Sequence, residues 1–239
     1  MISDDMTGSA SLTRLLDLND ALKRKSCFLF GPRQTGKTSL IRHTLKADHS
    51  FNLLESDTCL TLKRSPSRLR EEVIKPGSLV VIDEIQKAPE LLDEVQWLIE
   101  ERRIRFLLTG SSARKMRRGG VNLLGGRAHS LVLHPLVSEE LGAVDLMRAL
   151  RFGTLPSVYL GDDPERDLKD YVADDVQREV AHEGLVRNIP AFSRFLEVAA
   201  LCNGQMLNYS EIANDAQVPR TTVHEFFFDF ARHAARVEH

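Results

Sequence analysis

The sequence has few cysteines and no long apolar run, and each scarcity excludes a class of protein. Cys27, Cys59 and Cys202 are odd in number and far apart, so they form neither a disulfide framework nor a zinc-binding cluster. We expect them to be buried, reduced thiols. No apolar stretch approaches the roughly 18 residues that a membrane span requires. The acidic, polar N-terminus also lacks the layout of a signal peptide, so a cytoplasmic protein is expected.

An excess of one charge is also lacking, because the formal net charge of the 239 residues is -2. This balance argues against binding of a polyanion over the whole surface and leaves a local basic patch open. Charged residues make up 28% and hydrophobic residues 42% of the chain, as in a soluble globular protein. The length allows one sizeable core and a small second domain.

The sequence does contain a glycine-bearing loop between an expected strand, 27–30, and an expected helix, 39–46. Residues 31–38, GPRQTGKT, fit G-x-x-x-x-G-K-[ST], the P-loop pattern. Backbone N–H groups of such a loop and the helix N-terminus bind phosphates. Lys37 would reach the β- and γ-phosphates, and the Thr38 hydroxyl would hold Mg²⁺. The residues expected to contact the nucleotide are Gly31, Pro32, Arg33, Gln34, Thr35, Gly36, Lys37, Thr38 and Ser39.

A second motif follows the apolar run 79–82, which suits a central strand buried on both faces. Asp83 ends this strand and can bind Mg²⁺ opposite the P-loop hydroxyl, in the Walker B manner. Glu84 is placed to orient or deprotonate an attacking water. Thr109 and Ser111, which follow the next apolar run, could sense the γ-phosphate; Ser112 could equally cap a helix.

Residues 113–127, ARKMRRGGVNLLGGR, are basic and rich in glycine. They could insert an arginine into a neighbour's nucleotide site, contact nucleic acid, or remain solvated. Arg127 is the first candidate for such an arginine finger, and Arg118 the second.

Five strand-like runs alternate with helical patterns, at 27–30, 50–54, 78–84, 104–109 and 130–133. This alternation predicts an α/β fold with a doubly wound parallel sheet. Its ligand crevice is expected at the carboxyl ends of the strands, where the P-loop, Asp83 and Thr109 would meet. The P-loop core would cover residues 1–135. Within it, a helix over 12–22 is expected before the first strand, and a connection is expected over 55–66.

Beyond Pro135 only helical patterns remain, at 137–150, 167–183 and 191–202, in a lid or linker over 136–205. Residues 206–239 then show helix-turn-helix spacing, with Ser210 as helix cap. Inward positions would be Ile212, Ala213, Val218 and Val223. Arg220, Thr221, Thr222 and His224 would face a DNA groove; alternatively the unit serves packing or acts as a lid, since Glu211, Asp215, Glu225 and Asp229 lie close by.

With these motifs the chain resembles the prokaryotic P-loop ATPases of the AAA superfamily that carry a C-terminal DUF4143 region. The resemblance rests on stretches such as GPRQTGKTSLIR, LVVIDEIQKAPELL and NYSEIANDAQVPRTTVHEFF. It implies an AAA-like core followed by helices and a winged-helix-type unit, and it matches Arg127 to the arginine after the fourth strand. Such proteins continue further, which suggests that this chain is a C-terminally truncated member; a naturally short final helix is the alternative.

The function expected from these residues is that of an ATP-binding, Mg²⁺-dependent ATPase that couples hydrolysis to a conformational change, with a homo-oligomer and a protein client as possible partners. Lys37, Glu84, Thr109 and Arg127 would be catalytic, and Thr38 and Asp83 would bind the metal. A GTPase is disfavoured, because Asp83 is not followed by the D-x-x-G pattern and no N-K-x-D motif occurs. The alternatives are a DNA-binding or regulatory module in which ATP is only a switch and, last, a phosphotransferase.

Overall fold

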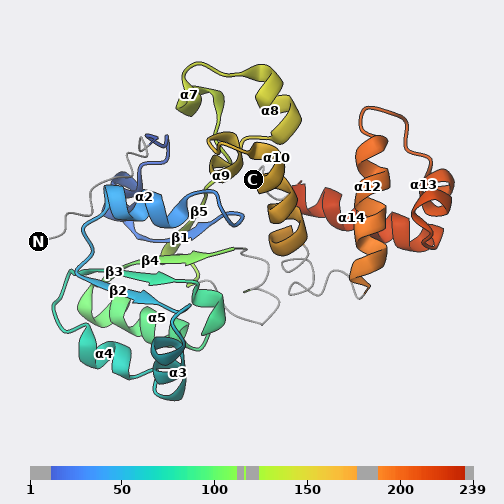
Figure 1. Cartoon of the computed structure of the whole chain (residues 1–239). Coiled ribbons are helices and arrows are strands. Elements are labelled where there is room, and N and C mark those ends of the chain that lie inside the picture. The colour runs from blue at the N-terminus through green and yellow to red at the C-terminus, as the bar shows by residue number, and fades with distance from the viewer. Residues whose placement is uncertain (1–11, 112–115, 117–123, 177–187, 235–239) are drawn as a thin grey trace, which may run out of the picture. The chain divides into compact units, whose positions relative to one another are not determined.

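The computed structural model describes residues 12–111, 116, 124–176 and 188–234, with the side chains of 174–176 and 229–234 left aside (Figure 1). The chain divides into two compact units, Met1–Pro164 and Glu165–His239. Each unit is described by itself below.

The first unit is built on a five-stranded, wholly parallel sheet, as the alternation of strands and helices predicted. Its strands are β1 (Ser26–Phe30), β2 (His49–Asn52), β3 (Leu79–Asp83), β4 (Arg105–Gly110) and β5 (Ala128–Val132). Their spatial order is β2-β3-β4-β1-β5, so β4 separates β1 from β3. The carboxyl ends of β1, β3 and β4 therefore meet at one edge of the sheet, with β4 in the middle.

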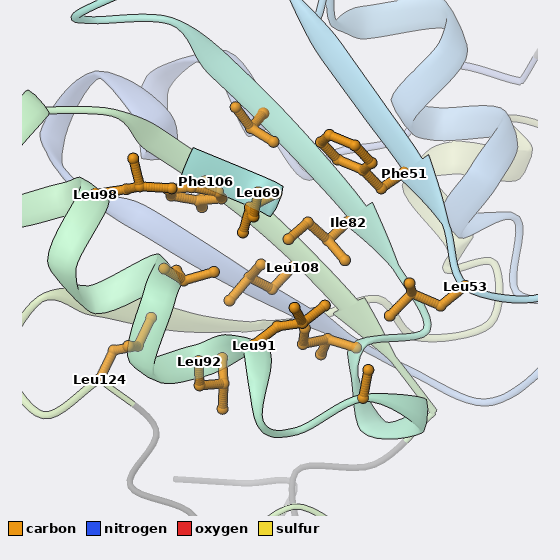
Figure 2. Close-up of a cluster of buried hydrophobic side chains, with 14 of the residues drawn as sticks. Phe51, Leu53, Leu69, Ile82, Leu91, Leu92, Leu98, Phe106, Leu108 and Leu124 are labelled. Carbon is orange, nitrogen blue, oxygen red and sulfur yellow. The ribbon is translucent and has the colours of Figure 1, made fainter. Parts of the chain in front are cut away.

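The two faces of the sheet bury alternate side chains, because successive residues of a strand point to opposite sides. One face carries Phe28, Ile82 and Leu108, and the other carries Leu29, Val81 and Leu107. Both sets are buried, which is why the central strands are apolar without interruption. Figure 2 shows the first layer, where leucines of a covering helix, including Leu91 and Leu98, lie against the strands.

Helices cover both faces, which makes the sheet doubly wound (Figure 1). Among the described residues, the helices of this unit are α1 (Leu18–Arg24), α2 (Lys37–Thr44), α3 (Ser56–Arg64), α4 (Arg68–Glu72), the 3₁₀ turn η1 (Ile85–Lys87), α5 (Leu91–Arg102), α7 (Ser138–Leu141), α8 (Leu146–Phe152) and α9 (Pro156–Tyr159). Leucines of α3, α4 and α5 pack on the Phe28 face, whereas α1 and α2 pack on the Leu29 face. This arrangement leaves the carboxyl edge of the strands open to the loops that follow them.

Three sequence expectations for helices in this unit were wrong. The continuous helix expected over 137–150 is two helices, because Gly142 has a positive φ of 65° and the Asp145 side chain caps a new start. The stretch expected to be a connection over 55–66 contains α3. The helix expected from Leu12 begins only at Leu18, after the N-cap Asp17.

The second unit contains helices among its described residues. They are α10 (Pro164–Asp170), which starts at the unit boundary, the π-helical turn η2 (Tyr171–Val176), α12 (Ile189–Leu201), α13 (Tyr209–Ala216) and α14 (Arg220–Ala234). Helices α12, α13 and α14 share a core formed by Phe192, Phe195, Ile212, Val223 and Phe226. The expected inward side chains of α13 and α14 are therefore buried. Ser210 is not the cap; Asn208 accepts the hydrogen bonds from the first N–H groups of α13.

The three cysteines are free thiols. Only Cys27 is fully buried, within the Leu29 layer, and this burial raises the pKa of its thiol to about 11. Cys59 and Cys202 are half-buried rather than buried. Among the described residues, no helix is both long and apolar enough to cross a membrane.

Candidate functional site

The loop between β1 and α2 has a backbone that only glycine allows at its first position. Gly31 has φ 155°, and a Cβ atom there would lie 2.4 Å from the carbonyl oxygen of Leu133. Gly36, with φ 89°, is the N-cap of α2, and Gln34 is also left-handed, with φ 62°. The loop thus bends tightly and ends at a helix N-terminus, where N–H groups are available to an anion.

Lys37 lies over this loop and holds its shape. Its Nζ donates to the carbonyl oxygens of Gly31, at 2.7 Å, and of Pro32, at 2.9 Å. The buried Thr35 hydroxyl donates to the same Pro32 oxygen at 2.9 Å. The lysine side chain is therefore already aimed at the concave side of the loop, where a phosphate would replace carbonyl oxygens as its partner.

The remaining predicted nucleotide contacts lie on the outside of the loop or in the first turn of α2. Arg33, Gln34, Thr38 and Ser39 are exposed, and Pro32 is half-buried. Exposure leaves the Thr38 hydroxyl accessible to an incoming ligand. The structure thus brings the P-loop residues together around one helix N-terminus, in the arrangement that the pattern indicated.

Asp83 and Thr109 form the second half of the site. The Thr109 side chain is fully buried; its hydroxyl donates to Asp83 Oδ1, and its Oγ1 accepts the Glu84 N–H at 3.1 Å. One hydroxyl of β4 thereby fixes both the carboxylate that ends β3 and the backbone of the next residue. Ser111 follows β4 and is half-buried, whereas Ser112 and Arg118 lie outside the described residues.

Glu84 adopts a left-handed backbone, with φ 60°, which is uncommon for a non-glycine residue. Its Oε2 accepts a hydrogen bond from Gln86 Nε2. Gln86 in turn lies against Gly110, where an added Cβ would come 2.7 Å from Gln86 Oε1. Gln86 therefore holds the Glu84 side chain, and the position of Gln86 depends on the absence of a side chain at Gly110.

Topology explains why these residues meet. The P-loop follows β1, Asp83 ends β3, and Thr109 lies near the end of the intervening β4. All three strands are parallel, so their carboxyl ends share one edge of the sheet, where open α/β sheets bind ligands. The hydroxyl of Thr38 and the carboxylate of Asp83 are oxygen donors of the kind that Mg²⁺ prefers. The residues present therefore fit a nucleotide with its metal.

Arg127 is not part of this constellation. It precedes β5, and Ser26 pairs with Ala128, so Arg127 lies beside the amino end of β1, about 16 Å of strand length away from the P-loop. Its guanidinium forms an ion pair with Glu100 and donates to Gly125 O at 3.1 Å. Within its own chain it belongs to the opposite edge of the sheet.

The structure also brings residues to the P-loop that the sequence did not indicate. Arg14 Nη1 donates to the carbonyl oxygen of Thr35 at 2.7 Å, and Ser157 Oγ donates to Gln34 Oε1 at 2.5 Å. Arg14 also pairs with Glu140, at 3.0 Å. Because these residues lie far from the P-loop in sequence, no local pattern reveals them. Gln86 could have been noticed from its spacing two residues after Glu84.

Comparisons with known proteins agree with the nucleotide site. A family model described as an AAA domain matches residues 23–142, half of the chain. A second, described as a domain of unknown function (DUF8612), matches residues 144–229. The expected DUF4143 region was therefore wrong. A search of curated proteins found no match.

Among solved structures, the Aeropyrum pernix ORC1 protein in complex with DNA is similar, with 15% identity, a TM-score of 0.38, and coverage of 87% of this chain and 77% of that chain. At this identity and TM-score the similarity carries no argument about function. The family assignment rests instead on the match over residues 23–142, and within that range lie the P-loop, Asp83, Glu84 and Thr109. The chain therefore belongs to the AAA domain family of P-loop ATPases.

Proposed function

We propose that this protein binds ATP with Mg²⁺, hydrolyses it, and couples hydrolysis to a conformational change. The observation that carries the proposal is the meeting of the Lys37 loop, Asp83 and Thr109 at the carboxyl ends of neighbouring strands. Oxygen ligands for a metal ion and hydrogen-bond donors for phosphate thus lie together at the carboxyl ends of the strands, as metal-assisted phosphoryl transfer requires.

Each residue has a role that follows from its position. Lys37 and the N–H groups of the loop bind the β- and γ-phosphates, and Thr38 and Asp83 hold the metal. Bound Mg²⁺ would neutralise charge on the phosphate oxygens as it develops. Glu84 orients and deprotonates the attacking water, and Thr109 keeps Asp83 in place through its hydroxyl.

Two substitutions separate binding from turnover. Lys37→Ala removes the cation that reaches the phosphates, so MgATP binding should be lost in calorimetry. Glu84→Gln keeps the size of the side chain and removes its basicity, so binding should remain while phosphate release falls by roughly 100-fold or more. Arg24→Ala, at an exposed position of α1, is the control that should leave both unchanged. Undiminished hydrolysis by the Glu84 variant would remove Glu84 from the catalytic role.

We further propose Arg127 as an arginine finger supplied in trans. Its side chain is 39% exposed and lies at the edge of the sheet opposite the P-loop, so it can serve a neighbouring copy but not its own site. A finger of this kind stabilises charge on the transferred phosphoryl group.

We do not extend the proposal to DNA binding by α13 and α14. Arg220, Thr221 and His224 are exposed as a groove-facing surface would require. Across residues 188–228, however, acidic residues outnumber lysine and arginine, and Arg194 donates to the carbonyl oxygen of Ala216 at 3.0 Å. Phosphate contacts usually dominate affinity for DNA, and this unit offers few. Packing or lid use of the unit is the favoured alternative.

A further inference from the structure

A buried arginine upstream of the sheet contacts the P-loop from outside. Arg14 donates through Nη1 to Thr35 O at 2.7 Å and through Nη2 to His134 O at 2.6 Å, and its Nε lies 3.0 Å from Glu140 Oε1. Its side chain is 7% exposed. One guanidinium therefore joins the P-loop, the segment after β5 and α7.

Both carboxylate oxygens of Glu140 also accept hydrogen bonds from backbone N–H groups. Its side chain is 4% exposed, and its two oxygens accept the N–H groups of Leu15, at 2.8 Å, and Val137, at 3.2 Å. Burial alone would raise the pKa of Glu140. The hydrogen bonds from Arg14 and from the two N–H groups, together with the positive charge of Arg14, outweigh burial and lower that pKa. The carboxylate is thus ionised and fixed, so it holds the guanidinium of Arg14 in one place.

The bond from Arg14 acts on a specific peptide group. A trans peptide is planar, and its C=O and N–H point in opposite directions. Because Arg14 holds the oxygen of Thr35, the N–H of Gly36 must point away from Arg14. Gly36 is the N-cap of α2, and N–H groups at that position are the ones that bind phosphate.

We propose that the buried Arg14–Glu140 pair is a positioning device for the nucleotide site, which fixes the Thr35–Gly36 peptide in its phosphate-binding orientation and ties that orientation to α7. The inference rests on the proposed function, because it concerns the same phosphate site. Arg14 acts through the loop backbone and does not itself touch the phosphates. Since Glu140 neutralises its charge, the effect of Arg14 on binding is geometric.

Calorimetric titration with MgADP, a ligand that needs no turnover, tests this. Arg14→Ala should weaken the affinity roughly tenfold or more, because a charge-assisted hydrogen bond to the loop is lost. Arg14→Lys should restore little of it, since one ammonium group cannot reach three acceptors in different directions. Guanidinium ion at millimolar concentration, added to Arg14→Ala, should recover part of the affinity. A merely destabilised protein would not respond in this way.

A stability-matched control excludes a global effect. Leu22→Ala removes a buried side chain of α1 without touching the P-loop, so it should destabilise the protein and leave the affinity of the folded fraction unchanged. Glu140→Ala should weaken binding in the same direction as Arg14→Ala, and the double variant should be no weaker than the single ones, because the two side chains act as one unit.

The outcomes separate the inference from the proposed function. If the wild-type protein does not bind MgADP, the proposed function fails. If it binds and Arg14→Ala binds as tightly, only the role of Arg14 is overturned. Equal losses in Arg14→Ala and Leu22→Ala, measured on the folded fraction, would also overturn it. A flatter salt dependence of affinity in Arg14→Ala would identify Arg14 as a direct phosphate ligand instead of a positioning residue.

Discussion

Gly31 is the residue at which the P-loop leaves least freedom, because it follows β1 directly and lies against the chain after β5. Gly31→Ala would place a methyl group 2.4 Å from the backbone oxygen of Leu133, and no side-chain rotation can relieve a contact with backbone. The hydrogen bond from Leu133 N to Phe30 O, 2.8 Å long, would have to break or shift. We expect a loss of at least about 3 kcal/mol in unfolding free energy and loss of MgATP binding.

The matched control is Gly77→Ala. Gly77 has a positive φ of 77°, but nothing lies within 4 Å of its Cβ position. Its substitution therefore imposes backbone strain alone, about 1–2 kcal/mol, and should spare nucleotide binding. Urea denaturation of the two variants separates these contributions, and equal losses would show that the contact with Leu133 is not the cause.

At the residue scale, the sequence predicted the positions of residues that belong to a local motif. Lys37, Asp83 and Thr109 lie where their spacing after buried strands indicated, because parallel strands end at a common edge. The sequence could not indicate Arg14, since its partners Thr35 and Glu140 are brought to it only by the folded chain. Contacts between residues distant in the sequence produce neither a hydrophobic periodicity nor a short motif that could be recognised.

At the scale of elements, the aromatic core of the second unit offers a direct test. Phe195 of α12 is fully buried, and its ring lies 4.9 Å from that of Phe226 and 5.0 Å from that of Phe227, both in α14. Phe195→Ala should therefore cost about 3–5 kcal/mol and expose the amides of α12 and α14 to hydrogen exchange. Glu197→Ala, exposed on the same helix, is the control that should change neither.

Apolar pattern predicted the strands better than the helices. The central strands β1, β3 and β4 were recognisable because strands buried in a parallel sheet are apolar on both faces. The spatial order of the strands could not be predicted, because nothing in the sequence of a strand indicates that β4 lies between β1 and β3. α3 was missed because its sequence, SDTCLTLKR, is mostly polar and buries only Leu62. The helix expected over 137–150 failed at Gly142, whose positive φ ends α7.

At the scale of the whole molecule, the binding residues of the nucleotide site lie at the carboxyl ends of the strands, and Arg127 lies at their amino ends. A strand of five residues spans about 16 Å, so a single rigid core cannot bring Arg127 to its own phosphates. If Arg127 is catalytic, a second copy must supply it. The ion pair of Arg127 with Glu100 is half-exposed, which makes it weak enough to exchange.

A mixing experiment tests this arrangement. Arg127→Ala should retain MgATP binding and lose roughly 1,000-fold in turnover, as the loss of an arginine finger does. Glu84→Gln is inactive for a different reason but still carries Arg127. Mixed protomers would place an intact Arg127 from one copy against an intact Glu84 in the other, so turnover should reappear in the mixture and rise with protein concentration. Arg24→Ala, mixed with Glu84→Gln in the same way, should show only its own turnover. Full activity of Arg127→Ala alone, or no recovery in the mixture, would exclude a finger supplied in trans.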